Sequence, residues 1–198
     1  MLKADQLKED LKALLAGRRP ERIEGKGTDY TEASVLLPLF VRDGRWWILF
    51  TKRTSTVEYH KGEVSFPGGV VDEADNSLES AAKRETFEEI GIREEDIEIM
   101  GQLNDMRTVR SRFIIHPFVG VVPFPYAFTV NETEVESLIE VPLQFFFDAS
   151  QPRPFPITQE GHTFETPAYI YRGVVIWGAT ERILEDFINL IRPKIRLY

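Results

Sequence analysis

Cysteine is absent from the sequence, although the chain has 198 residues. Its absence excludes a disulfide framework, catalysis by a thiolate and zinc sites with cysteine ligands. A chain without cysteine is typical of a reducing compartment, and we expect a cytoplasmic location. No apolar run approaches the roughly 18 residues that a membrane-spanning helix needs. The N-terminal stretch MLKADQLKEDLKALL carries a charge every few residues, so we expect neither a signal peptide nor a membrane partner.

Positive charge is scarce relative to negative charge. The chain has 24 lysine and arginine residues against 32 aspartate and glutamate residues, which gives a formal net charge of -8. This balance makes nonspecific binding to DNA, RNA or anionic membranes unfavourable, and we expect no nucleic-acid partner. An acidic protein can still bind a phosphorylated small molecule where it gathers metal cations.

Hydrophobic residues make up 42% of the chain, which suffices for one well-filled core or two small ones. Leu7, Leu11, Leu14 and Leu15 recur at helical spacing and predict an amphipathic N-terminal helix. The Asp-Gly pair at 43–44 lies between two apolar segments and predicts a hairpin turn. Strands are expected at 34–41, 46–51, 97–103, 113–122, 163–170 and 174–177, and helices at 78–90 and 179–191.

Two later segments carry weaker patterns. Residues 135–147 predict a short helix or turn, followed by the apolar run 143–147. Residues 151–156 contain three prolines that alternate with other residues, so we expect a loop there. Strands first, with one helix in the middle and one at the end, indicate an α+β fold. We expect a single domain over 1–198, with a helix and connection at 1–30, a core at 33–150 and C-terminal strands and a helix at 160–198.

The helix expected at 78–90 carries an unusual group of acids in the stretch RETFEEIG. At 100° per residue, Glu85, Glu88 and Glu89 fall within an arc of roughly 100°. Like charges three and four residues apart repel, and the C-terminal end of a helix favours cations. One interpretation is a solvated acidic face. The other is a site for a hard cation, because Mg²⁺ and Mn²⁺ take oxygen ligands and would cancel the repulsion.

The same helix places further side chains by its period. Arg84 lies four residues before Glu88 on the same side, so it can pair with that carboxylate and orient it. Phe87 and Ile90 are expected to point the other way, into a core.

The residues before this helix favour the cation site. Gly68 and Gly69 follow a proline and indicate a place where backbone comes close to another group. An acidic loop at 72–75 then leads into Asn76 and Ser77, which suit the helix N-cap.

The whole stretch GGVVDEADNSLESAAKRETFEEIGI resembles the Nudix box, G-x5-E-x7-R-E-U-x-E-E-x-G-U, where U is aliphatic. Thr86 stands where an aliphatic residue is usual. The box glutamate falls on Asp75, and eight residues rather than seven separate it from Arg84. The positions that match are Gly69, Arg84, Glu85, Glu88, Glu89, Gly91 and Ile92.

This resemblance implies a Nudix α/β/α sandwich with a mixed sheet, and hydrolysis of a nucleoside diphosphate linked to another group. It also implies Mg²⁺ or Mn²⁺ as cofactor, with Arg84 orienting the glutamates. The cation would neutralise the pyrophosphate, activate water and steady the leaving phosphate. Glu85 is the first candidate for the general base, and Glu134 in a distant loop is the alternative. The metal ligands carried over from the family are Glu85, Glu88, Glu89 and the Gly69 carbonyl.

Residues before the box narrow the substrate. The stretches 49–53 and 60–69 resemble the coenzyme A diphosphatase branch of the family, with Thr51 and Arg53 in register. That branch would release 3′,5′-ADP and 4′-phosphopantetheine. Thr54 and Glu58 depart from its pattern, since Glu58 stands where the branch has arginine.

Arg53 and Lys61 are the candidates for contacts to substrate phosphates, with plain surface charge as the alternative. The rival substrate for this small-molecule nucleotide site is ADP-ribose or another nucleoside diphosphate derivative, which the Glu58 departure favours. A non-catalytic nucleotide-binding module is the third alternative. It would be expected to lose box acids, and none of the three box glutamates is missing here.

Overall fold

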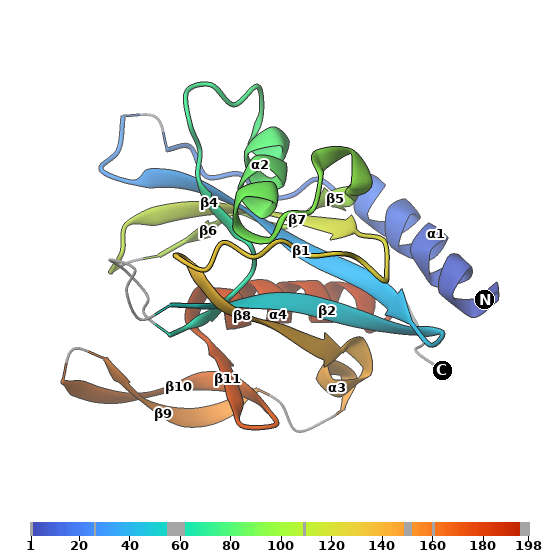
Figure 1. Ribbon diagram of the computed structural model, residues 1–198. Helices are drawn as coiled ribbons and strands as arrows, with labels where there is room; N and C mark the ends of the chain where they lie inside the picture. Colours follow the sequence, from blue (N-terminus) through green and yellow to red (C-terminus); the bar gives the residue numbers. More distant parts are fainter. Residues whose placement is uncertain are drawn as a thin grey trace.

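The computed structural model describes residues 2–25, 27–54, 62–108, 110–148, 152–159 and 161–194 (Figure 1). In chain order the elements are α1 (Leu2–Ala16), β1 (Thr31–Arg42), β2 (Arg45–Arg53), β3 (Val64–Ser65), β4 (Gly68–Val70), α2 (Leu78–Ile90), the 3-10 helix η1 (Glu94–Asp96), β5 (Glu98–Gln102), β6 (Met106–Arg107), β7 (Phe113–Val121), β8 (Val135–Pro142), α3 (Leu143–Phe147), β9 (Arg153–Gln159), β10 (His162–Tyr171), β11 (Val174–Trp177) and α4 (Gly178–Ile191). Within these described ranges, no helix is long and apolar enough to cross a membrane.

The larger sheet is mixed and has eight strands. Its main path runs β3-β2-β1-β7-β5, while β4 pairs with β1, β6 with β7 and β8 with β2. Strand β1 runs parallel to β7, and its pairings with β2 and β4 are antiparallel. The hairpin between β1 and β2 turns at Asp43 and Gly44, whose φ angles of 52° and 72° are those of the predicted turn. The prediction of a mixed sheet is confirmed.

Both faces of this sheet are buried, because the side chains of β1 alternate between two cores. Leu36 and Phe40 pack in the cluster that includes Ala82 and Ile90 of α2. Leu37 and Leu39 belong to the other cluster, which includes residues of α1 and Phe187 of α4. Figure 1 shows α2 and α4 on opposite sides of the large sheet. The predicted α/β/α sandwich is confirmed.

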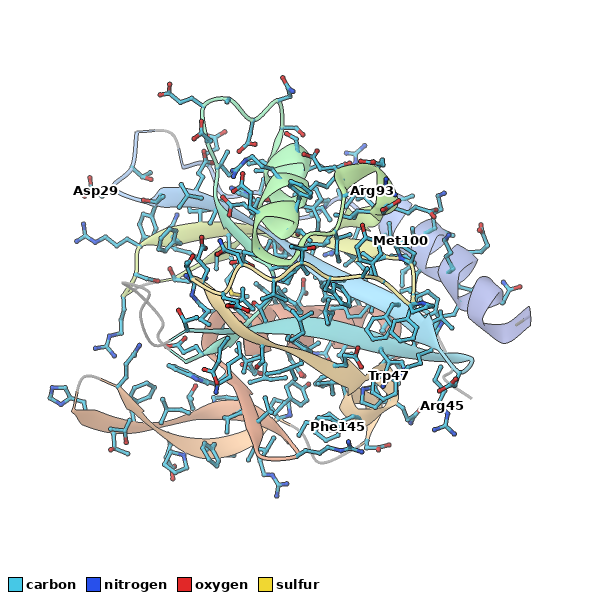
Figure 2. All side chains as sticks on the ribbon, in the orientation of Figure 1. Asp29, Arg45, Trp47, Arg93, Met100 and Phe145 are labelled. Carbon is cyan, nitrogen blue, oxygen red and sulfur yellow. The ribbon has the colours of Figure 1, made fainter. Side chains whose placement is uncertain are left out.

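The segment at 135–147 differs from its prediction. Residues of β8 pair with β2 over seven positions, and the apolar run that follows forms the short helix α3. The acids that obscured the strand pattern have basic partners in the same sheet, since Glu136 pairs with Lys52 of β2 and Glu140 with Arg42 of β1. The Arg42 guanidinium also lies 3.7 Å from the ring centroid of Trp47, which Figure 2 shows near the end of the hairpin.

A second sheet has three antiparallel strands in the order β11-β10-β9. The prediction of a loop at 151–156 is wrong from Arg153 onward, because that segment begins β9. Pro154 lies opposite Pro167, and Pro156 lies two residues further along the same edge strand. Proline has no backbone N–H, and residues two apart in a strand direct this group to the same side. An edge strand tolerates both prolines when that side faces away from β10, because no hydrogen bond to the neighbouring strand is then lost.

The small sheet shares a hydrophobic cluster with the large one. Tyr169 and Ile176, from β10 and β11, pack in the same cluster as Phe50 and Phe146. This shared core favours the single domain predicted over 1–198, which stays a prediction.

Candidate active site

Two glycines bring the backbone of β4 close to β1 and to α2. A side chain on Gly68, whose φ is 148°, would overlap the Ser34 carbonyl oxygen. A side chain on Gly69 would overlap the Glu85 carboxylate. Glycine is therefore needed at 68, where the clash is with backbone and φ is positive, whereas a side chain at 69 would displace the Glu85 carboxylate. The β4 backbone thus lies close to Glu85 of α2.

Helix α2 begins and ends as its sequence predicts. Ser77 and Ser80 form a capping box, and Gly91 ends the helix with a φ of 75° while its N–H donates to the Phe87 carbonyl. Ile90 is buried as expected, but the prediction that Phe87 enters the core is wrong, since Phe87 is 50% exposed. Thr86 is buried in its place, with its hydroxyl donating to the Ala82 carbonyl at 2.7 Å.

Arg84 uses all five of its N–H donors. Two bonds of 2.9 Å go to the carboxylate of Asp75, and one of 3.1 Å goes to the Val70 carbonyl. The remaining two reach Glu85 at 2.9 Å and Glu88 at 3.0 Å. The bonds to Asp75, above all, hold the pKa of Arg84 above its ordinary value, and they lower the pKa of Asp75 in turn. The pairing of Arg84 with Glu88 that helical spacing predicts is present, and Arg84 bonds Glu85 as well.

Asp75 was not among the predicted site residues, although its place in the box pattern could have pointed to it. The extra residue before Arg84 is absorbed in the loop. Asp75 donates its N–H to the Asp72 carbonyl at 3.0 Å, and its carboxylate accepts from the Asp72 N–H at 2.8 Å.

The three box glutamates differ in their surroundings. Glu88 is exposed, Glu85 is largely covered and Glu89 is only 2% exposed. Burial raises the pKa of Glu89 to about 8, against the opposing effects of Arg53 and of the Gly68 N–H. Burial likewise raises the pKa of Glu85, which its hydrogen bond with Arg84 opposes.

Two further predicted residues lie at the same place. Arg53, near the end of β2, has its Nη1 3.5 Å from Glu89 Oε1, and the Gly68 N–H donates to the other oxygen at 3.3 Å. The charge of Glu134, in the loop before β8, contributes to the raised pKa of both Glu85 and Glu89. Lys61 and Glu58 lie outside the described residues, and their predicted roles stay predictions.

The donor set suits a hard divalent cation. It offers carboxylate oxygens from Glu85, Glu88 and Glu89, and the Gly69 backbone passes close to the first of these carboxylates. Burial raises the pKa of Glu89 to about 8 although Arg53 lies beside it, and the charge of a bound metal would favour the ionised carboxylate further. Across the described ranges, no three His, Asp or Glu side chains are already gathered as a finished metal site. Arginines instead contact each of these glutamates, and a metal would compete with them.

Two surface pockets lie near α2. One of about 350 Å³ is lined at the C-terminal end of α2 by Phe87, Glu88, Gly91 and residues 129–131, beside the acids. The other, of about 290 Å³, lies at the opposite end of the helix, where Leu78, Glu32 and His116 are among its lining residues. Glu88 is the one box glutamate among the lining residues of the first pocket, and none of the three lines the second.

The sequence profile of the NUDIX domain matches residues 30–164. The chain belongs to the Nudix family. Two relatives named "Uncharacterized Nudix hydrolase NudL" support this membership. The one from Enterobacter sp. (strain 638) is 37% identical over 155 residues, which cover 78% of this chain and 80% of the relative. The one from Citrobacter koseri is 34% identical over 168 residues, which cover 85% of this chain and 86% of the relative.

Solved structures agree on the fold. The Nudix hydrolase RenU from M. smegmatis superposes with a TM-score of 0.57 over 85% of this chain and 89% of that one, at 14% identity. A MutT/nudix family protein from Enterococcus faecalis superposes with a TM-score of 0.53 over 94% of this chain and 70% of that one, at 16% identity. Family and relatives together make this Nudix chain a diphosphatase that acts on nucleoside diphosphate-linked substrates. Nudix enzymes generally use divalent cations such as Mg²⁺ or Mn²⁺.

Proposed function

We propose that this enzyme hydrolyses the pyrophosphate bond of coenzyme A or its derivatives, releasing 3′,5′-ADP and 4′-phosphopantetheine. The observation that carries this proposal is the position of the residues that resemble the coenzyme A branch. Arg53 and Gly68 both contact the buried carboxylate of Glu89. The residues that would distinguish the branch therefore adjoin the acids that would perform the chemistry.

In the proposed reaction the box acids hold the cation. Glu85, Glu88 and Glu89 with the Gly69 carbonyl would bind Mg²⁺ or Mn²⁺, which when bound stabilises the charge of the pyrophosphate and of the leaving phosphate. Arg84 keeps two of these carboxylates oriented through its hydrogen bonds.

Substrate phosphates would be held by cationic side chains. The Arg53 guanidinium is near Glu89 and partly exposed, so it can turn from that carboxylate to a phosphate oxygen. Lys61 is proposed as the second contact on its sequence position alone.

We propose Glu134 as the general base. Glu85 lies against the Gly69 backbone and accepts from the charged Arg84, which favours a role as metal ligand. The Glu134 carboxylate accepts a hydrogen bond from the neutral amide of Asn131 and carries no arginine contact within the described chain. It is therefore the freer of the two acids to take a proton from water.

ADP-ribose is the second candidate substrate, because Glu58 reverses the charge that the coenzyme A branch places at its position. A panel of coenzyme A, acetyl-coenzyme A, ADP-ribose, NADH and dinucleoside polyphosphates, with and without Mg²⁺ or Mn²⁺, separates these possibilities. We expect metal-dependent hydrolysis with coenzyme A as the preferred substrate. If the enzyme prefers ADP-ribose, ADP-ribose replaces coenzyme A as the proposed substrate. If no compound is hydrolysed, the result favours the non-catalytic nucleotide-binding module.

The setting of the reaction is proposed from composition. Without cysteine, the chain suits the reducing cytoplasm. Its net charge of -8 fits a small nucleotide held through metal ions rather than a nucleic-acid partner.

A further inference from the structure

The side chain of Asn131 is fixed at both ends within a tight turn. Its Oδ1 accepts from the backbone N–H of Thr133 at 3.2 Å and from the Thr133 hydroxyl at 2.6 Å. Its Nδ2 donates to Glu134 Oε1 at 3.2 Å. A backbone N–H can only donate, so the amide oxygen must face Thr133, which leaves the NH₂ group facing the carboxylate.

The backbone of Asn131 ties this turn to the end of α2. The Asn131 N–H donates to the carbonyl of Glu89 at 2.8 Å. The Asn131 carbonyl in turn accepts from the N–H groups of Glu134 at 3.0 Å and Val135 at 2.9 Å. Asn131 therefore connects Glu89, the most buried of the box glutamates, with Glu134 in the loop.

A second attachment joins the turn to β2 on the other side. The Thr54 N–H donates to the Glu134 carbonyl at 2.9 Å, and the Thr54 hydroxyl donates to the Thr133 carbonyl at 3.0 Å. Thr54 directly follows Arg53, which contacts Glu89. The turn thus bridges α2 and β2 across the site, and the Asn131 amide bonds to the Glu134 side chain within it.

We infer that Asn131 is a positioning residue, whose amide holds the Glu134 carboxylate in place relative to Glu89 during catalysis. The inference rests on the role proposed above for Glu134 as general base. A general base must lie within hydrogen-bond reach of the water that it deprotonates, and small displacements of a catalytic group cost much rate. The charge of Glu134 reaches both Glu85 and Glu89, as the pKa values of those two acids reflect.

The test is a cycle of near-isosteric variants: Asn131→Asp, Glu134→Gln and the double variant. Asn131→Asp keeps the acceptor for Thr133 but places a carboxylate oxygen against Glu134. We expect kcat to fall by about tenfold to a hundredfold with KM nearly unchanged. Asn189→Asp is the matched control, because the Asn189 amide donates to Glu185 in the same way on α4, and its kcat should stay at the wild-type level.

The double variant separates positioning from stability, because it exchanges the amide and the carboxylate and so restores a hydrogen bond in the turn. We expect its Tm to recover toward wild type while its kcat stays within about twofold of Glu134→Gln alone. Recovery of kcat along with Tm, or a loss equal to the product of the single losses, would overturn the inference. Asn131→Ser takes the same place in the cycle if Asn131→Asp does not fold.

The outcomes also separate this inference from the proposed function. Wild-type enzyme is assayed first with coenzyme A and Mg²⁺, and with ADP-ribose if coenzyme A is not cleaved; an inactive wild type would overturn both proposals. If the wild type is active and Glu134→Gln keeps a near-normal kcat, Glu134 is not the general base and Asn131 has no positioning role. The proposed diphosphatase function would be unaffected by that result.

Discussion

The buried carboxylate of Glu89 should make the metal-free protein lose stability as the pH rises. The native state raises the pKa of this group from 4.5 to about 8, mainly because burial disfavours its charge. The folded protein therefore binds the proton more tightly than the unfolded chain. This contribution to stability is complete below pH 4.5 and is lost as the pH rises through about 8.

The size of the effect follows from the same values. A rise in pKa from 4.5 to about 8 corresponds to about 5 kcal/mol of unfolding free energy, lost at about 1.4 kcal/mol per pH unit. Glu181 adds a second contribution of the same sign, because burial raises its pKa to about 7. The variant Glu89→Gln removes the first contribution and keeps the second, so the difference between the two proteins isolates Glu89.

The assay is urea unfolding in EDTA at several pH values between 5 and 9, followed by the fluorescence of the three tryptophans. Wild type should lose more stability over this range than Glu89→Gln, by several kcal/mol. Added Mg²⁺ should stabilise wild type more at pH 9 than at pH 5, because the cation binds the ionised acid. Equal losses of unfolding free energy in wild type and Glu89→Gln would refute the conclusion that burial keeps Glu89 protonated in the metal-free protein.

Two further predictions concern the backbone and the arginine of the site. Gly69→Ala should lower kcat/KM by about tenfold or more, because the new methyl group overlaps the Glu85 carboxylate, and wild-type turnover in this variant would contradict the close approach. Arg84→Lys should lower kcat by about a hundredfold, since lysine cannot reproduce the five hydrogen bonds, whereas Arg93→Lys, which loses an exposed bidentate bond to Asp96, should leave it unchanged. Equal kcat values in the two lysine variants would show that Arg84 only adds surface charge.

Local signals in the sequence predicted helix α2 with its observed bounds. Ser77 supplies the N-cap and Gly91 supplies the left-handed C-cap, and both act within a few residues of the helix ends. The orientation of Phe87 was missed because the buried stripe of α2 contains Thr86 and Glu89. Burial of Glu89 is tolerated because Arg53 and the Gly68 N–H, which lie outside α2, contact its carboxylate. Helical periodicity does not reveal such partners.

Strand β9 and strand β8 were missed for a related reason. Alternating prolines exclude an interior strand but not an edge strand, and the edge position depends on the pairing of the whole small sheet. In β8 the acidic residues Glu136 and Glu140 hide the strand pattern until basic residues of β2 and β1 are brought beside them. Tertiary pairing decided both cases.

The candidate site was predicted more fully than these strands, because the box carries its acids on one helix. The structure gathers Arg84, Gly69 and the box glutamates around β4 and α2, and Arg53 joins them from β2. Asn131 had no local signal, since its role depends on contacts with the end of α2.

The proposed substrate is tested most sharply by comparing kcat/KM for coenzyme A with kcat/KM for ADP-ribose in the presence of Mg²⁺. We expect a higher value for coenzyme A, with 3′,5′-ADP and 4′-phosphopantetheine as products and turnover lost in a folded Glu89→Gln variant. Efficient hydrolysis of ADP-ribose with none of coenzyme A would contradict this expectation.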